Sequence, residues 1–342
     1  MKLKNIVTIG GGTGSFMLLS GLKKYPVNIS AIVSMADDGG STGILRDELG
    51  VLPPGDVRQC LVALSDSSKE LRELMNYRFE EGGLKGHNFG NLLLSALEKI
   101  EGSFSKGVEE ATKILNVKGE VIPVTDQNTN LFILLKNGKL LKGEEQINHN
   151  FDIEKTGIGK NYLKPEARAN KKAIQKILEA DLIVIGPGNY YCSIAPNFLV
   201  KGISEAIRKS KAKVVYNCNL VNKHGHTEKF TLDDYVDSIN NYIGKERIDF
   251  VTFNNRKPNE KLIEKYESKR ELLIQFDKKN KDKRNFRVIR ADILSNNKPE
   301  FSKSDALAGQ RSFIRHDPHK LAKVLMMILE LGEYENIIKE II

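Results

Sequence analysis

The chain has 342 residues, of which 40% are hydrophobic and 28% charged, so it can build a sizeable core without disulfide or metal staples. Its three cysteines, Cys60, Cys192 and Cys218, are far apart and odd in number, which excludes a disulfide framework and a CxxC metal site. No apolar run approaches the ~20 residues of a membrane-spanning helix, and no signal-peptide pattern precedes the glycine run after Ile9. We therefore expect a soluble cytoplasmic protein without a membrane span.

The formal net charge of +9 raises the question of nucleic-acid binding. Only 14 of the 53 basic residues are arginine, the residue that contacts phosphate and guanine through two parallel hydrogen bonds. The densest basic stretch, residues 278–290, lacks an interleaved aromatic platform. We interpret it as a solvated loop and expect no nucleic-acid partner.

Short β-branched runs alternate with longer helical patterns along most of the chain. This order is typical of a parallel sheet whose faces are covered by helices. Buried strands are predicted at residues 5–9, 29–33, 182–185 and 214–217. Helices are predicted around the apolar residues of 16–22, 57–64, 91–97, 169–178 and 199–210, and Asp56 can cap the second of them.

Residues 120–160 break this alternation. Strands are predicted at Val121–Val124 and Leu131–Lys136, and Asn137-Gly138 before Lys139–Leu141 is a strong hairpin pattern. We therefore expect a small antiparallel β insertion, or a sheet edge, at about 120–160. A single α/β domain over residues 1–342 accounts best for the whole pattern.

The last predicted helix covers about 318–342. Asp317 followed by Pro318 is typical of a helix start, because proline is favoured at the first helical position. The apolar residues that follow at helical spacing are Leu321, Val324, Leu325, Ile328 and Leu331. They form one stripe, which predicts that this helix packs on the α/β body.

A glycine run, Gly10–Gly14 with Ser15, follows the first predicted strand and opens a helix. Free backbone N–H groups and the positive end of the helix dipole meet at such a turn, which suits a phosphate or diphosphate. The pattern departs from a dinucleotide fingerprint because Ser15 takes the third glycine position, and it lacks the lysine of a P-loop. The alternative is a tight turn without a ligand.

Two adjacent carboxylates, Asp37 and Asp38, follow the second predicted strand. Such a carboxylate could bind a ribose hydroxyl, as in dinucleotide-binding folds, or the pair could hold Mg²⁺ together with substrate phosphates. The alternative is an Asx turn in which Asp37 accepts a hydrogen bond from the glycines that follow.

Two further polar turns complete the pattern. Gly186–Asn189 follows the strand predicted at 182–185, and Gly86–Asn91 opens a helix. Because ligands bind at the carboxyl ends of strands in open α/β sheets, we expect the turns that follow strands to converge on one crevice. His87 is either a member of this site or a local helix cap.

Several blocks of sequence occur in one order along the chain: Gly10–Ser15 (GGGTGS), Ala36–Gly43 (ADDGGSTG), Leu45–Gly50 (LRDELG), Leu52–Arg58 (LPPGDVR), Gly86–Leu94 (GHNFGNLLL), Gly186–Asn197 (GPGNYYCSIAPN) and Arg315–Asp317 (RHD). Together they resemble the gluconeogenesis-factor family (YvcK-type). This is the bacterial branch of a CofD-like superfamily that includes the 2-phospho-L-lactate transferases of coenzyme F420 synthesis. The resemblance extends from Lys4 to about Leu331. It departs from the usual pattern after Gly188 and after His87, where the loops are kept but their side chains change.

The resemblance implies a Rossmann-like three-layer α/β fold that binds a nucleotide diphosphate. Proteins of this branch are thought to bind UDP-sugars, notably UDP-N-acetylglucosamine, and to support cell-wall synthesis and cell shape during gluconeogenic growth. The function implied is thus that of a metabolite-sensing regulator. The alternative is an enzyme of the transferase branch, whose crevice holds a guanosine diphosphate carrying phospholactate together with a divalent metal.

Carried over to this chain, the resemblance also assigns site residues. The predicted cradle for the diphosphate is Gly11, Gly12, Thr13 and Gly14. The predicted crevice lining is Asn88, Asn91, Gly188 and Asn189, with Arg315 and Tyr266 at the nucleotide or sugar end. Asp37 and Asp38 would bind a metal, for which Mg²⁺ is the candidate, or a ribose. No NAD is expected, because of Ser15 and because no substrate-domain His or Arg motif is recognisable. A homo-oligomeric state is left open.

Overall fold

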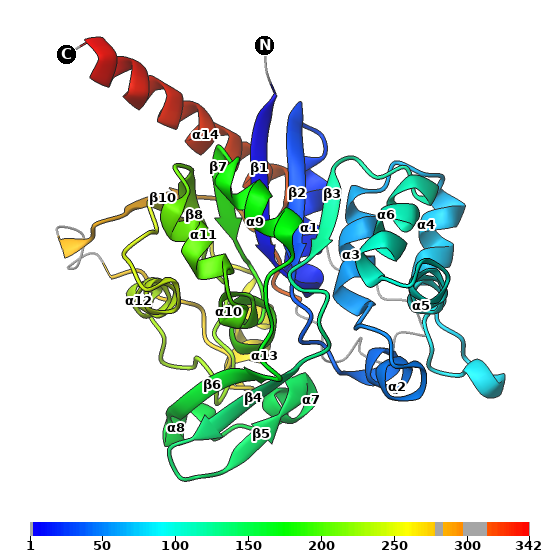
Figure 1. Ribbon diagram of the computed structural model, residues 1–342. Helices are drawn as coiled ribbons and strands as arrows, with labels where there is room; N and C mark the ends of the chain where they lie inside the picture. The colour runs from blue at the N-terminus through cyan, green and yellow to red at the C-terminus, as the bar shows by residue number, and fades with distance from the viewer. Residues whose placement is uncertain (1–2, 278–282, 297–312, 342) are drawn as a thin grey trace.

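A seven-stranded sheet, parallel throughout, forms the centre of the structure (Figure 1). The computed structural model describes residues 3–277, 283–296 and 313–341. In sheet order the strands are β10 (Arg287–Ala291), β9 (Phe250–Asn254), β8 (Lys213–Asn217), β7 (Leu182–Ile185), β1 (Lys4–Gly10), β2 (Val27–Val33) and β3 (Glu120–Pro123). The predicted strands β1, β2, β7 and β8 are all present. Within the basic stretch 278–290, residues 278–282 lie outside the described residues. Residues 287–290 belong to β10, so the prediction of a solvated loop is wrong for this part.

Helices cover both faces of this sheet, which gives the predicted three-layer α/β fold. Helices α1 (Gly12–Leu22), α3 (Gly55–Leu64) and α14 (Pro318–Ile341) pack together on one face, and α9 (Lys171–Leu178), α10 (Ala195–Leu199), α11 (Ile203–Lys209) and α12 (Leu232–Ile243) lie on the other. The central strands are apolar on both sides, as a doubly covered sheet requires, and all four residues of β7 are buried. The remaining helices of the main body are α2 (Gly40–Leu49), α4 (Lys69–Asn76), α5 (Phe89–Glu101), α6 (Phe104–Ile114) and α13 (Glu260–Glu267).

A second, antiparallel sheet lies beyond the carboxyl ends of the central strands (Figure 1). It consists of β5 (Leu140–Lys142), β4 (Asn130–Leu135) and β6 (Ile158–Lys164), with the short helices α7 (Gly143–Asn148) and α8 (Ile153–Thr156) between β5 and β6. Leu134 pairs with Leu140, so the hairpin predicted at Asn137-Gly138 is confirmed. Alternate residues of β4 are buried, as expected for a strand with one covered face.

The structure differs from the prediction at the start of this insertion. Residues 120–123 form β3, which pairs in parallel with β2 at the edge of the main sheet and is not part of the antiparallel unit. Val121 and Ile122 are both buried, and such a fully apolar pair is typical of a strand covered on two faces. The antiparallel sheet itself begins at Asn130.

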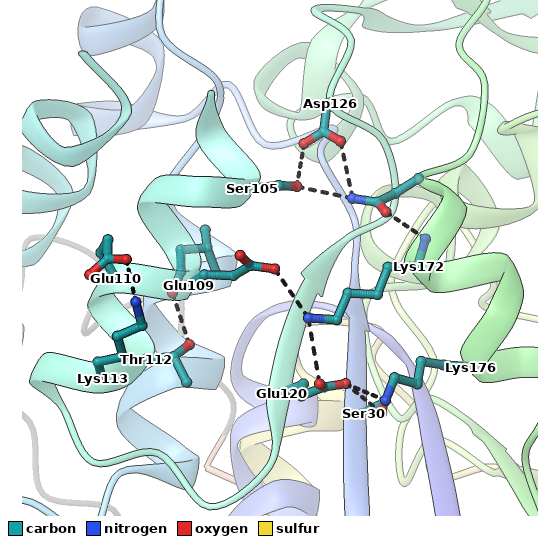
Figure 2. Close-up of polar contacts among 12 residues, drawn as sticks. Ser30, Ser105, Glu109, Glu110, Thr112, Lys113, Glu120, Asp126, Lys172 and Lys176 are labelled. Carbon is teal, nitrogen blue, oxygen red and sulfur yellow. Dashed lines mark hydrogen bonds and ion pairs between the residues drawn. The ribbon is translucent and has the colours of Figure 1, made fainter. Parts of the chain in front are cut away.

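A polar network holds the exposed rim of β3 against its neighbours (Figure 2). The Glu120 carboxylate lies 2.8 Å from the Lys176 ammonium and 3.4 Å from that of Lys172, both on α9. Lys172 also pairs with Glu109 of α6 at 3.1 Å. These side chains are partly exposed, so each pair contributes at most about 1 kcal/mol. The network therefore fixes the orientation of α6 and α9 around the edge strand more than it adds stability.

Helix α14 packs on α1 through most of the predicted stripe. Leu321, Val324, Leu325 and Ile328 are buried, but Leu331 is 42% exposed. The stripe thus ends one turn earlier than predicted, because the helix runs past the edge of the body and projects away from it (Figure 1). No helix in the described part of the chain combines the length and apolar character needed to cross a membrane.

Replacement of Gly21 by alanine should lower the free energy of unfolding by about 1–3 kcal/mol, the usual cost of forcing an atom into a packed contact. A Cβ at Gly21 would lie 2.0 Å from the carbonyl oxygen of Pro318, at the contact of α1 with α14. Chemical denaturation measures the change. In the control, Gly83→Ala, the added Cβ meets no atom within 4 Å and should have little effect. Equal stabilities of the two variants would contradict this packing.

Candidate functional site

The glycine loop after β1 lies at the point where the order of the sheet reverses. Strand β1 has β2 on one side and β7 on the other, and the connection through α1 leads to β2. In open α/β sheets the crevice for a ligand forms outside the carboxyl ends of the strands at this kind of position. The predicted turns after β1, β2 and β7 are therefore neighbours, since they follow adjacent strands.

Close backbone contacts explain two of the glycines in the first loop. A Cβ on Gly14 would lie 2.0 Å from the carbonyl oxygen of Pro187, so only glycine lets the loop after β7 approach α1. A Cβ on Gly11 would lie 2.2 Å from Oδ2 of Asp56. Helix α1 begins at Gly12, and its N-cap residue, Gly11, has no side chain that could cap the first turn. The N–H groups of Thr13 and Gly14 lie at this half-buried helix start, an arrangement that suits a phosphate.

Asp56 belongs to this site, and the sequence analysis missed that role. It was predicted to cap α3, but the N-cap of α3 is Pro54, and the Asp56 side chain lies against Gly11 and accepts the N–H of Gly12. Burial, followed by the charge of Asp37, raises the pKa of Asp56 to about 7. The Pro-Pro-Gly-Asp turn gave a local signal for a helix start, but it carried no information about the distant glycine loop.

Asp37 and Asp38 point to different partners. Oδ1 of Asp37 accepts the N–H of Gly39 at 3.0 Å, which is the predicted Asx turn, while Oδ2 lies 2.5 Å from the position of a Cβ on Gly55, next to Asp56. Oδ1 of Asp38 accepts the N–H of Glu145 at 3.1 Å and so joins the loop after β2 to α7 of the insertion. Asp37 therefore faces the Gly55–Asp56 turn, and Asp38 connects the loop after β2 to the insertion.

A third carboxylate, Glu144, enters the site from α7. Its burial and the charges of Asp37 and Asp56 raise its pKa well above the ordinary value, and burial likewise raises the pKa of Asp37. Three carboxylates on three different elements thus oppose one another's ionisation. Among the residues that the structure describes, no three His, Cys, Asp or Glu side chains form a ready metal site. The Mg²⁺ site expected at Asp37 and Asp38 stays a prediction, in which substrate phosphates and water would complete the metal shell.

Asparagine side chains fix the loop after β7. Nδ2 of Asn217 donates to the carbonyl of Gly186 at 3.2 Å, and Asn219 contacts both the N–H (3.4 Å) and the carbonyl (2.9 Å) of Gly188. Nδ2 of Asn189 donates to Oδ1 of Asn148 on α7 at 2.7 Å. The loop is thus held on one side by residues at the end of β8 and on the other side by α7 of the insertion.

Lys223 is a further residue that the sequence analysis did not select. Its ammonium donates to Oδ1 of Asn148 at 2.5 Å and lies close enough to Glu144 and Cys192 to interact with them electrostatically. Burial lowers its pKa. It therefore places a largely desolvated cation beside the acidic residues, where a phosphate could reach it.

The predicted residues Asn88 and Asn91 lie at the start of α5. Oδ1 of Asn88 accepts the N–H of Asn91 at 3.1 Å, which is helix capping, and Oδ1 of Asn91 accepts Nε of Arg58 at 3.0 Å. Ser41 Oγ lies 3.2 Å from Nδ1 of His87, so this turn contacts the start of α2. These residues border the Asp37 loop while their side chains support α5 and Arg58.

Arg315 and Tyr266 occupy the corner beside β8. The Tyr266 hydroxyl accepts the N–H of Phe313 at 2.6 Å and of Ile314 at 3.3 Å, which positions the segment before Arg315. The next residue, His316, lies 3.2 Å through Nε2 from the carbonyl of Cys218, just after β8. Arg315 therefore lies between a segment held by Tyr266 and a histidine held against the end of β8. Their ligand contacts stay predictions.

This arrangement defines an α/β protein whose glycine loop lies where the strand order reverses, and comparison with known proteins gives its family. The 2-phospho-L-lactate transferase CofD family matches residues 6–294, and the chain belongs to this family. Within it, the chain is similar to the gluconeogenesis factor of Bacillus subtilis, with 38% identity over 95% of this chain and 98% of that protein. The gluconeogenesis factor of Halalkalibacterium halodurans is 44% identical over 73% of this chain and 77% of its own length. The resemblance inferred from the sequence blocks is confirmed.

A solved structure supports the same grouping. The crystal structure of a UPF0052 family member from Bacillus halodurans matches this chain with a TM-score of 0.85 and 36% identity, covering 95% of this chain and 99% of that one. The α/β fold is therefore shared over nearly the full length of both chains.

Asp56→Asn should raise the free energy of unfolding at pH 8 by about 1–3 kcal/mol relative to the wild type. This gap between the two proteins should narrow toward pH 5. The pKa of Asp56 is about 7 in the folded protein against an ordinary 3.8, so the folded state binds more protons between these values. Wild-type stability attributable to this group therefore falls as the pH rises through that window, and asparagine removes the effect. Urea denaturation at pH 5, 6.5 and 8 measures the gap.

Asp66→Asn is the matched control with the opposite sign. The hydrogen bond from Lys118 lowers the pKa of Asp66, so its contribution to stability is present above the ordinary pKa and is lost as the pH falls. Its removal should lower stability at neutral pH. A gap for Asp56→Asn that does not change with pH would contradict the assignment.

Proposed function

We propose that the protein is a cytoplasmic regulator that binds a UDP-sugar of the UDP-N-acetylglucosamine type and acts in gluconeogenic growth, cell-envelope synthesis and cell shape. The observation that carries this proposal is the start of α1 at Gly12, which has a glycine at its N-cap, packs against the loop of Gly188 and is backed by Asp56. Gluconeogenesis-factor relatives that align over nearly the whole chain support it.

The diphosphate would lie on the N–H groups of the Gly11–Gly14 loop, where the helix dipole favours negative charge. The carboxylates of Asp37 and Glu144 would repel it there. A divalent cation such as Mg²⁺ between these carboxylates and the phosphate oxygens removes that repulsion. Lys223 supplies a second positive charge on the side of the insertion.

The two ends of the ligand would extend along the remaining loops. Asn189 and the α7 residue Asn148 line one side of the crevice, and Asn88 and Asn91 border it near α5. Arg315 is the candidate for the nucleotide or sugar end, because its guanidinium offers several donors in a fixed plane. The ligand would thus bridge the main sheet and the insertion.

UDP-N-acetylglucosamine at 100 times its dissociation constant should raise the free energy of unfolding by about 2.7 kcal/mol, and Mg²⁺ should strengthen the binding. Asp37→Asn should remove the Mg²⁺ effect. Asp47→Asn, an exposed carboxylate on α2, is the control and should behave as wild type. Thermal denaturation with and without Mg²⁺ measures the shifts, and chromatography of the recovered ligand should find it intact. Stabilisation by guanosine nucleotides alone would contradict the proposal.

A second candidate is a transferase, supported by the match to the CofD family and by the raised pKa of Glu144. A carboxylate whose pKa is raised is a stronger base and can accept the proton of an attacking hydroxyl. In that reaction the acceptor oxygen would bond to the phosphorus that carries lactate, and guanosine monophosphate would leave. Phosphorus NMR of a guanosine diphosphate-type donor with a hydroxylated acceptor and Mg²⁺ tests it. Release of guanosine monophosphate that depends on both the acceptor and Glu144 would establish the enzyme.

A further inference from the structure

A cavity of about 380 Å³ lies at the far ends of α1 and α3, away from the glycine loop. Residues that end these two helices meet there with α4 and with the first turn of α14. The volume is within the range of about 300–1,000 Å³ that is typical of small-molecule sites. The cavity shares no residue with the crevice described above.

Positive charge dominates this cavity. Lys23, Lys24, Lys69 and Arg72 line it, and the one carboxylate in the lining, Glu73, pairs with Lys69 at 3.5 Å. The other three cations contact neutral atoms. Lys23 donates to the carbonyl of Ser65 at 2.7 Å, Lys24 lies 3.1 Å from Nε2 of His319, and Arg72 donates to the carbonyl of Ser67.

These cations also repel one another. The pKa of Lys23 is lowered, first by burial and then by the charge of Arg72, with a smaller opposing effect from Asp66. Asp66 itself pairs with Lys118 at 3.1 Å. A bound anion would relieve this repulsion and would accept hydrogen bonds from donors that come from both α1 and α4.

The floor of the cavity is apolar. Val62 and Ala63 are buried at the end of α3, and the half-buried side chains of Phe16 and Pro318 flank them. An arginine fork beside lysine point charges is the usual arrangement for phosphate, and an apolar floor favours a ligand with a carbon body. A free inorganic ion would leave this floor uncovered.

We propose that this cavity is a second ligand site, for a small phosphorylated organic molecule. Its phosphate contacts Lys24 and Arg72, and its carbon part lies on Phe16 and Val62. Helix α1 starts at the glycine loop and α3 starts beside Asp56. The opposite ends of both helices therefore border a separate anion site. The proposal does not depend on the UDP-sugar assignment.

Phenyl phosphate is a suitable probe, because it combines a phosphate with a flat apolar ring. Isothermal titration of the full chain in phosphate-free buffer should give saturable binding that is tighter than for inorganic phosphate. Lys24→Gln should weaken it about tenfold, as expected for one lost charge-assisted hydrogen bond. Ser20→Phe, which fills the cavity without a change of charge, should abolish it. Lys209→Gln removes an equal charge on α11 and should leave the affinity unchanged.

Unchanged binding in both Lys24→Gln and Ser20→Phe would overturn the proposal, because the probe would then occupy another site. Equal affinity for inorganic and phenyl phosphate would overturn the role of the apolar floor. Capture of the protein by anionic lipid vesicles without binding of phenyl phosphate would assign the charges to a membrane surface and contradict the proposal. Lys24 is exposed, so its variant keeps the test valid even if Ser20→Phe fails to fold.

Discussion

Mutual repulsion among Asp37, Asp56 and Glu144 is the constraint on which the rest of the site depends. The fold holds these carboxylates on the loop after β2, on α3 and on α7. Burial raises the pKa of all three, and the charge of Asp37 adds to this effect for Asp56 and Glu144. The start of α1 offsets part of this cost, because Asp56 accepts the N–H of Gly12. A ligand that brings both a cation and a diphosphate would satisfy the carboxylates and the remaining amides together.

The antiparallel insertion is part of this arrangement. Asp38 accepts the N–H of Glu145, and Asn148 receives hydrogen bonds from Asn189 and Lys223, so α7 joins the loops after β2 and β7. These contacts cross between the two sheets. The insertion thus supplies one wall of the crevice and contributes Glu144 to its chemistry.

Local patterns in the sequence were sufficient for most of the fold. β-Branched runs predicted β1, β2, β7 and β8 but not β9 or β10, and Asn137-Gly138 predicted the hairpin, because periodicity and turn geometry depend on near neighbours. Strand β3 was grouped with the insertion because a four-residue apolar run does not reveal its pairing partner. Asp56 and Lys223 were missed for the same reason, since their partners lie far along the chain. Glycine patterns located the loops, but only the packed structure shows which side chains meet there.

The most direct test of the central account is anomalous diffraction from crystals grown with UDP and Mn²⁺, which scatters strongly and replaces Mg²⁺ at oxygen sites. We expect one Mn²⁺ between the diphosphate and the carboxylate of Asp37, with the phosphates on the amides of Gly11–Gly14. A diphosphate bound elsewhere, or bound on this loop with no ion near Asp37 or Asp56, would contradict the view that the carboxylates and the glycine loop form one site.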